Sequence, residues 1–171
     1  MARSIFTATV MLLIAACGAN AEQGISDATA PVSIPDTEAS STAPAGAANV
    51  EAVTVRGEAG SYSFSVVVRS VDTGCDQYSD WWEALSESGE LVYRRVLLHS
   101  HVDEQPFTRT GGPVDVQPGD TIIVRAHMNT SGFGGVAMRG SVADGFSVVE
   151  LPSGFADGVE TVEPLPTSCA F

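Results

Sequence analysis

The sequence contains no lysine. Its 171 residues include eight basic residues of the Lys and Arg class, all of them arginine, against 21 aspartates and glutamates, and the formal net charge is −13. Proteins bind nucleic acid by neutralising phosphates with a basic face, and no basic cluster is present here. We therefore expect no nucleic-acid partner. A polybasic patch cannot attach the chain to anionic lipids either, so any membrane attachment must have another cause.

Long hydrophobic runs are almost absent as well. The exception is residues 5–16, which are apolar apart from two threonines, follow Arg3 and end in small residues. A bilayer core requires about 20 apolar residues, so this run is too short for a lasting transmembrane helix. A basic start, a short apolar core and a small-residue end are typical of a secretory signal.

The end of this leader carries a resemblance. Ile14, Ala15, Ala16 and Cys17 look like the lipobox of bacterial lipoprotein precursors. The resemblance implies that Cys17 becomes the mature N-terminus, with a diacylglycerol on its sulfur and an acyl chain on its amine. Two or more chains anchor a protein stably, so membrane lipid would be a partner through Cys17. The alternative is an ordinary secreted protein in which Cys17 is incidental.

Cysteine is scarce, with three residues in all. Once Cys17 is assigned to the leader, Cys75 and Cys169 remain in an exported chain, where pairing is the default. We expect them to form a disulfide. A reactive thiol pair or metal thiolates are the alternatives, but neither cysteine lies in the CxxC spacing that such sites normally show.

Large apolar residues are nearly missing from residues 18–49, which consist mainly of Ala, Ser, Thr, Pro and Gly with four acids and no base. Such a segment cannot bury enough surface to offset its chain entropy. We expect a disordered tether, which places the lipoprotein signal in residues 1–17 and the folded domain in residues 50–171.

The folded domain shows short β-type runs separated by turn residues about every ten positions, which is typical of a sandwich or barrel. The clearest run is 61–70, where Tyr62, Phe64, Val66 and Val68 alternate with mostly polar residues. Gly89 marks a hairpin turn. Further strands are expected at 51–56, 80–86, 91–102, 136–142 and 146–151, with two more in 113–128 on either side of a turn at 117–120. We predict an all-β, antiparallel sandwich of seven to nine strands, similar in strand rhythm to immunoglobulin-like and fibronectin-type domains.

Two adjacent tryptophans, Trp81 and Trp82, fall on one expected strand and must point to opposite faces. One should lie in the core. The other is either exposed, as a platform for a sugar or a partner, or covered by a loop, as large aromatics mostly are.

The first two histidines lie two residues apart on the expected strand 91–102. His99 and His101 then share a face with Tyr93 and Arg95 and point outward. The opposite, core-facing set consists of Val92, Val96, Leu98 and Val102.

The third histidine, His127, shares a face with Arg125 on another expected strand. Together with His99 and His101 it could form a Zn or Cu site, and Met128 and Met138 would suit Cu(I). In an immunoglobulin-like strand order, however, the strand 80–86 separates the two histidine strands by about 10 Å. Polar residues on a wet sheet face are therefore favoured over a metal site.

The sequence shows no serine elbow, cysteine–histidine pair or paired carboxylates on one strand face. We therefore expect a non-catalytic envelope lipoprotein without a cofactor, whose β-sandwich has either a binding or a structural role, with an envelope protein or a glycan as the candidate partner. Metal binding through the histidines and carbohydrate binding through an exposed tryptophan are the alternatives. The candidate ligand-binding residues are Trp81, Trp82, Tyr93, Arg95 and Arg125.

Overall fold

The computed structural model describes residues 46–170. Residues 1–45, which contain the predicted lipid cysteine and most of the predicted tether, lie outside the described residues, as does Phe171. The described part contains eight strands and one 3-10 turn. Their bounds are β1 Asn49–Glu58, β2 Ser61–Arg69, β3 Ser79–Ser86, β4 Leu91–Val96, β5 Phe107–Val114, β6 Ile122–Met128, β7 Ala137–Ser141, β8 Gly145–Val149 and η1 Val159–Thr161.

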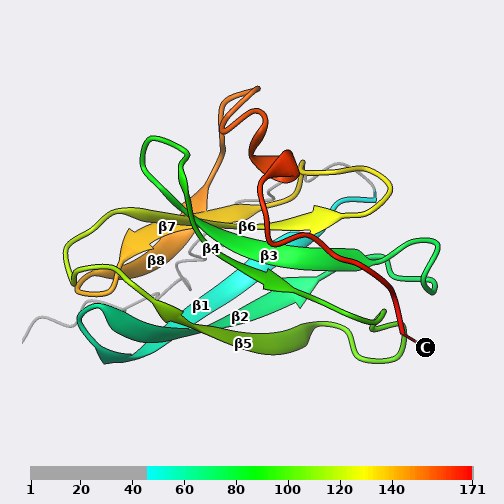
Figure 1. The fold of residues 1–171 in the computed structure, drawn as a ribbon, viewed down its shortest axis with the longest axis horizontal. Coiled ribbons are helices and arrows are strands. Elements are labelled where there is room, and N and C mark those ends of the chain that lie inside the picture. Colours follow the sequence, from blue (N-terminus) through cyan, green and yellow to red (C-terminus); the bar gives the residue numbers. More distant parts are fainter. Residues whose placement is uncertain (1–45, 171) are drawn as a thin grey trace, which may run out of the picture. The chain divides into compact units, whose positions relative to one another are not determined.

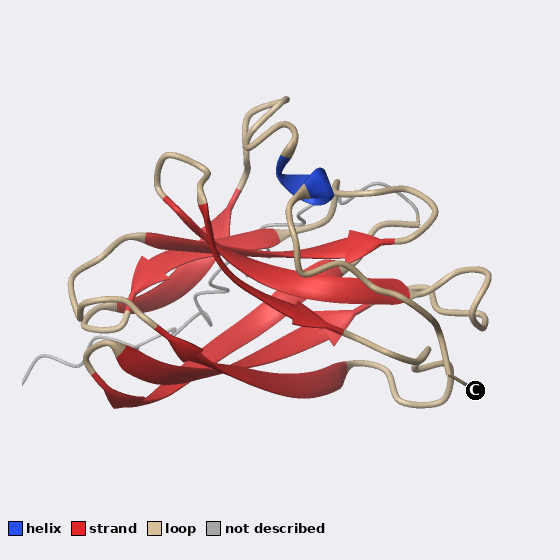
Figure 2. Ribbon diagram, viewed as in Figure 1, coloured by secondary structure: helices blue, strands red, loops and turns tan. Residues whose placement is uncertain are grey.

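The strands form two antiparallel sheets. One has the order β1-β2-β5 and the other the order β4-β3-β6-β7-β8. The sheets pack face to face, and the single short helical turn lies on the far side of the five-stranded sheet (Figures 1 and 2). The predicted all-β antiparallel sandwich is confirmed, and β3 lies between β4 and β6, as expected. Within residues 46–170, no helix has the length and apolar character needed to cross a membrane.

The main core lies between the two sheets. The alternation predicted for β2 is confirmed, because Tyr62, Phe64, Val66 and Val68 are all buried. Trp82 of β3 packs against them from the five-stranded sheet. A second, smaller apolar cluster lies on the opposite face of that sheet, which we call the outer face, and is centred on Leu85, Ile123 and Val159.

The turn predictions agree with the structure better than the strand bounds do. Ser86 donates its N–H to the carbonyl of Glu90 at 2.9 Å, and Gly89 has φ +87°, so the predicted β3–β4 hairpin is confirmed. Likewise Asp120 donates its N–H to Gln117 at 3.1 Å in the predicted turn. The strand before that turn, however, is β5 at Phe107–Val114, six residues earlier than the expected start at 113.

The face assignment predicted for residues 91–102 is wrong for most of this run, although Val92 packs against the core and His99 is exposed, as predicted. β4 ends at Val96, and its register shifts so that Ala84 lies opposite Tyr93 while Leu85 lies opposite Leu91. Val92 is left without a partner and forms a β-bulge. The bulge turns the side chains that follow it to the other face of the sheet. Tyr93 consequently packs on Trp82, with ring centroids 5.6 Å apart, on the core side.

Beyond β4 the chain leaves the sheet, so strand alternation no longer applies. Leu97 is buried, whereas Leu98 and Val102, both predicted to face the core, are 51% and 46% exposed. The predicted disulfide between Cys75 and Cys169 is confirmed. It fixes the end of the C-terminal segment, residues 150–170, which crosses the outer face without regular strands (Figure 1).

Candidate functional site

A buried carboxylate lies at the centre of the outer face. Glu83 of β3 lies opposite Arg94 of β4 and opposite Arg125 of β6. Arg94 donates to Glu83 Oε2 from Nη2 at 2.6 Å and from Nε at 2.9 Å, and Arg125 Nε donates to Oε1 at 2.9 Å. The Glu83 and Arg94 side chains are fully buried, and that of Arg125 is 7% exposed. The three residues form one row across three neighbouring strands.

The same two arginines hold the C-terminal segment. Arg94 donates from Nη2 to the carbonyl of Val159 at 2.9 Å and from Nη1 to the carbonyls of Val162 and Pro164. Arg125 Nη1 donates to the carbonyl of Phe155 at 3.0 Å. Buried charges are tolerated only when their polar atoms are paired, and the irregular segment supplies backbone acceptors that a regular strand would already have used.

His127 occupies the end of this face and is fixed from two sides. Its Nδ1 lies 2.6 Å from Asp80 Oδ1, and its ring stacks on Trp81 with centroids 3.6 Å apart and planes 7° apart. A register shift between Ser79 and Trp81 brings Asp80 to this position. Because an ionised carboxylate only accepts hydrogen bonds, Nδ1 donates its proton to Asp80, and Nε2 is then an acceptor whenever the ring is neutral.

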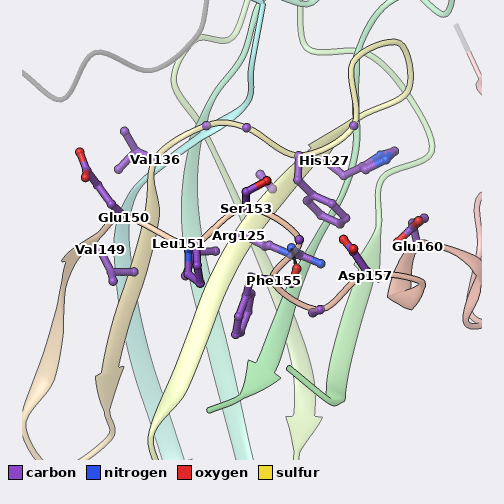
Figure 3. Close-up of a pocket in the computed structure, with 18 residues that line it drawn as sticks. Arg125, His127, Val136, Val149, Glu150, Leu151, Ser153, Phe155, Asp157 and Glu160 are labelled. Atoms are coloured by element: carbon purple, nitrogen blue, oxygen red, sulfur yellow. Dashed lines mark hydrogen bonds between the residues drawn. The ribbon is translucent and has the colours of Figure 1, made fainter. Parts of the chain in front are cut away.

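Beside His127, the outer face is hollowed into a cleft of about 630 Å³, a size usual for small-molecule sites. We call it the outer-face cleft (Figure 3). Its floor is formed by Arg125 and His127 of β6, and its two walls by the glycine-rich loop 132–136 and by residues 149–157 of the β8 end and the C-terminal segment. The chain folds locally into these walls because Gly132 and Gly134 have φ of +71° and +157°, values that favour glycine.

The cleft combines a buried cation with an acidic rim. Burial lowers the pKa of Arg125, while the charge and hydrogen bond of Glu83 raise it. Arg125 Nη2 has no hydrogen-bond partner among residues 46–170. The rim carries Glu150, Asp157 and Glu160, all exposed. The site therefore offers one unused buried donor and three solvated carboxylates to a bound molecule.

Trp81 and Trp82, both candidate ligand-binding residues, are buried. Trp82 lies in the sandwich core with no exposed area, and Trp81 lies on the outer face, 4% exposed beneath Arg94, whose Cζ is 4.6 Å from its ring centroid. Of the two alternatives for the second tryptophan, the covered one is observed and the exposed platform is wrong. A glycan site that requires an exposed tryptophan has none to use here.

The structure separates the predicted histidine site. His99 and His101 lie together, with ring centroids 4.6 Å apart, in the loop after β4. His127 lies on β6 against Trp81 and Phe133, with β3 between its strand and β4. In residues 46–170, no group of three or more His, Cys, Asp or Glu side chains is arranged to hold a metal ion.

The prediction that His101 points outward is wrong. His101 is 3% exposed and stacks on Phe107, with centroids 3.8 Å apart. Neither ring nitrogen has a hydrogen-bond partner in the described chain, and burial lowers the pKa of His101, followed by the charge of Arg109. Its backbone N–H instead donates to Asp72 Oδ2 at 2.7 Å. The histidine thus packs as an aromatic residue against Phe107, which belongs to the core.

Of the five candidate ligand-binding residues, the structure brings Trp81 and Arg125 to the outer face. Trp82 and Tyr93 belong to the core, and Arg95 donates to the carbonyl of Thr110 on the other sheet. The sequence prediction missed Glu83, Arg94 and Asp80. A charged residue inside the apolar run 81–85 is the signal that could have identified Glu83, because such a residue on a buried strand needs a partner of opposite charge.

Comparison with known proteins gives a relative that bears on function. A protein of Halomicrobium mukohataei named "Putative lipoprotein" is 42% identical over 93 residues, which are 53% of this chain and 45% of that protein. The chain therefore spans less than half the length of this relative. No family model and no solved structure matches the chain. The chain is thus similar, over about half its length, to a protein named as a lipoprotein, which fits the lipoprotein class expected from the sequence.

Proposed function

We propose that this chain is a lipoprotein of the cell envelope, anchored by lipid on Cys17, whose β-sandwich binds a small molecule in the outer-face cleft without catalysing a reaction. The lipobox-like residues 14–17 and the relative named as a lipoprotein support the anchor. The observation that carries the binding role is Nη2 of Arg125, a residue of the cleft floor: this atom is buried and has no hydrogen-bond partner among residues 46–170.

Further details of the anchor follow from the sequence. Residues 18–45 act as the tether between the lipid and the sandwich. Gly18 rather than aspartate follows Cys17, and in a host with two membranes this favours sorting to the outer one.

An immunoglobulin-like relationship of the domain is supported by the strand order, because β4-β3-β6-β7 facing β1-β2-β5 matches the arrangement of such sandwiches.

The anchor is tested by replacing Cys17 with serine and separating membranes from soluble protein. Cys17→Ser should move the protein to the soluble fraction and abolish incorporation of labelled fatty acid, because lipid is its attachment. A matched control, Cys75→Ser with Cys169→Ser, removes the other two cysteines and should keep the label. Retention of Cys17→Ser in salt-washed membranes would contradict the anchor.

The binding site is tested separately by native mass spectrometry of protein purified from its own membrane. Ser153 is exposed and lines the cleft, so Ser153→Trp should fill it and displace a co-purifying small molecule. Ser61, exposed at the start of β2 away from the cleft, provides the control Ser61→Trp. A small molecule retained equally by both variants would place the binding site elsewhere.

A further inference from the structure

The buried charges beneath the outer-face cleft do not balance. Glu83 is paired with two arginines, so this row of three carries one positive charge in excess. Of the other carboxylates nearby, Asp80 is engaged by His127, and the exposed Glu160 acts on Arg125 only through its charge. The excess lies at the Arg125 end, where Nη2 is buried and lacks a partner in the described part of the chain. An unpaired guanidinium N–H in a desolvated place costs free energy that a bound carboxylate would recover.

His127, on the same face of β6, can accept a hydrogen bond where Arg125 donates one. His127 donates its Nδ1 proton to Asp80, which leaves Nε2 as an acceptor beside Gly132, where an added Cβ would lie 3.9 Å from that nitrogen. Residues two apart on a strand have Cα atoms about 7 Å apart. A ligand lying along β6 can therefore meet the donor of Arg125 with one end and the acceptor of His127 with the other.

The rim and walls add two further constraints. The rim carboxylates of Asp157 and Glu160 lie on the side of the cleft opposite Glu150 in Figure 3, and their charge favours a cation and disfavours a free anion. Phe155 and Leu151 supply an apolar wall.

We propose that the outer-face cleft binds a zwitterionic α-amino acid with an apolar side chain. Its carboxylate accepts from Arg125 Nη2, its ammonium donates to His127 Nε2 and is attracted by Asp157 and Glu160, and its side chain packs against Phe155 and Leu151. This rests on the proposed function and names the ligand class of the same cleft.

Entry of the carboxylate involves Phe133. Its ring lies over the guanidinium, with Arg125 Cζ 3.5 Å from the centroid, so binding as proposed requires the ring to move aside before a carboxylate reaches Nη2. Phe133 is flanked by Gly132 and Gly134, both with positive φ, so the loop backbone has the freedom to turn the ring aside. The ring then closes against the bound side chain.

The test is calorimetric titration of the purified exported chain with L-leucine and two analogues that each lack one charge. Leucine should bind, whereas 4-methylpentanoate, without the amine, and 3-methylbutylamine, without the carboxylate, should each bind about tenfold more weakly or worse, because each loses a charged hydrogen bond. Equal affinity for leucine and 4-methylpentanoate would overturn the inference that the cleft recognises a zwitterion. Absence of leucine binding at millimolar concentration would overturn the inference while leaving the anchor, measured by fractionation, intact.

Two variants locate the ligand in the cleft. Arg125→Lys keeps the charge but lacks Nη2, and should weaken leucine binding about tenfold or more. Asp157→Asn alters only an exposed rim residue, so the fold stays intact, and should weaken leucine severalfold while leaving 4-methylpentanoate unchanged or improved. Glu58→Gln, at an exposed position outside the cleft, is the matched control. Unchanged leucine affinity in Asp157→Asn and in Arg125→Lys would show that leucine binds elsewhere.

Discussion

Glu83 lies directly opposite Arg125 across the β3–β6 pair, and its Oε1 accepts the Nε–H of that arginine at 2.9 Å, while Oε2 accepts from Arg94 on the other side. A single carboxylate therefore holds two cations that in turn bind the backbone of the C-terminal segment. Burying charges costs desolvation energy, so the arrangement is stable only while all three members are present.

We predict that Glu83→Gln destabilises the fold by about 3–5 kcal/mol, because two buried arginines lose their counter-charge. Urea denaturation at neutral pH measures the free energy of unfolding. The matched control is Glu51→Gln, which breaks the exposed pair of Glu51 with Arg69 and should cost no more than about 1 kcal/mol. Similar losses in the two variants would show that the buried row contributes little.

The disulfide should stabilise the domain by constraining the unfolded chain. Cys75 and Cys169 are 94 residues apart in sequence, and closing a loop of about that length is worth at most about 5 kcal/mol in the loop-entropy model. We expect Cys75→Ala with Cys169→Ala to lose about 2–5 kcal/mol of unfolding free energy. Peptide mapping without reductant should show the two cysteines joined in exported wild-type protein, and free thiols there would contradict the pairing.

Stability should fall in mild acid because of His101. Burial lowers the pKa of His101 below its ordinary value of 6.5, so the unfolded chain takes up the proton first as the pH falls. The contribution of neutral His101 is fully present above pH 6.5. It declines as the pH falls through the lower folded-state pKa.

Replacing His101 with phenylalanine should reduce this acid sensitivity, because the variant keeps an aromatic ring against Phe107 and has nothing to titrate. Unfolding free energies at about pH 7.5 and about pH 5, roughly one unit or more on either side of the ordinary histidine pKa, measure the effect. His99→Gln, at an exposed position, should retain the acid sensitivity. An unchanged pH dependence in His101→Phe would exclude His101 as its source.

Salt should stabilise the protein. With a net charge of −13 and no lysine, the folded chain concentrates like charges, and their repulsion is screened as the Debye length falls from about 30 Å at 0.01 M to about 3 Å at 1 M salt. The melting temperature should therefore rise with NaCl and rise equally with KCl, since screening does not depend on which monovalent cation is used. A melting temperature that is independent of salt would contradict the role of repulsion.

Several features could be predicted from the sequence because they depend on local pattern or on chemistry that ignores geometry. Strand alternation identified the buried face of β2, and it correctly placed Arg125 and His127 together on one face of β6. The pairing of Cys75 with Cys169 followed from counting cysteines in an exported chain. Side chains two residues apart along a strand share a face, so the sequence indicates which of them lie together. Two available cysteines can pair in only one way, so their disulfide needs no structural information.

Only the tertiary structure determined which side chains lie on the outer face of the five-stranded sheet and which segment covers that face. The bulge at Val92 exchanged Arg94 for Tyr93 on the outer face, and a one-residue register change is invisible to alternation because both registers bury half the side chains. The C-terminal segment then covers the face through contacts such as that of Arg94 with Val159, which are 65 residues apart. Periodicity is local, whereas the burial of Glu83 and the cleft over Arg125 depend on a distant segment folding back, so the site exists only once the whole domain has assembled.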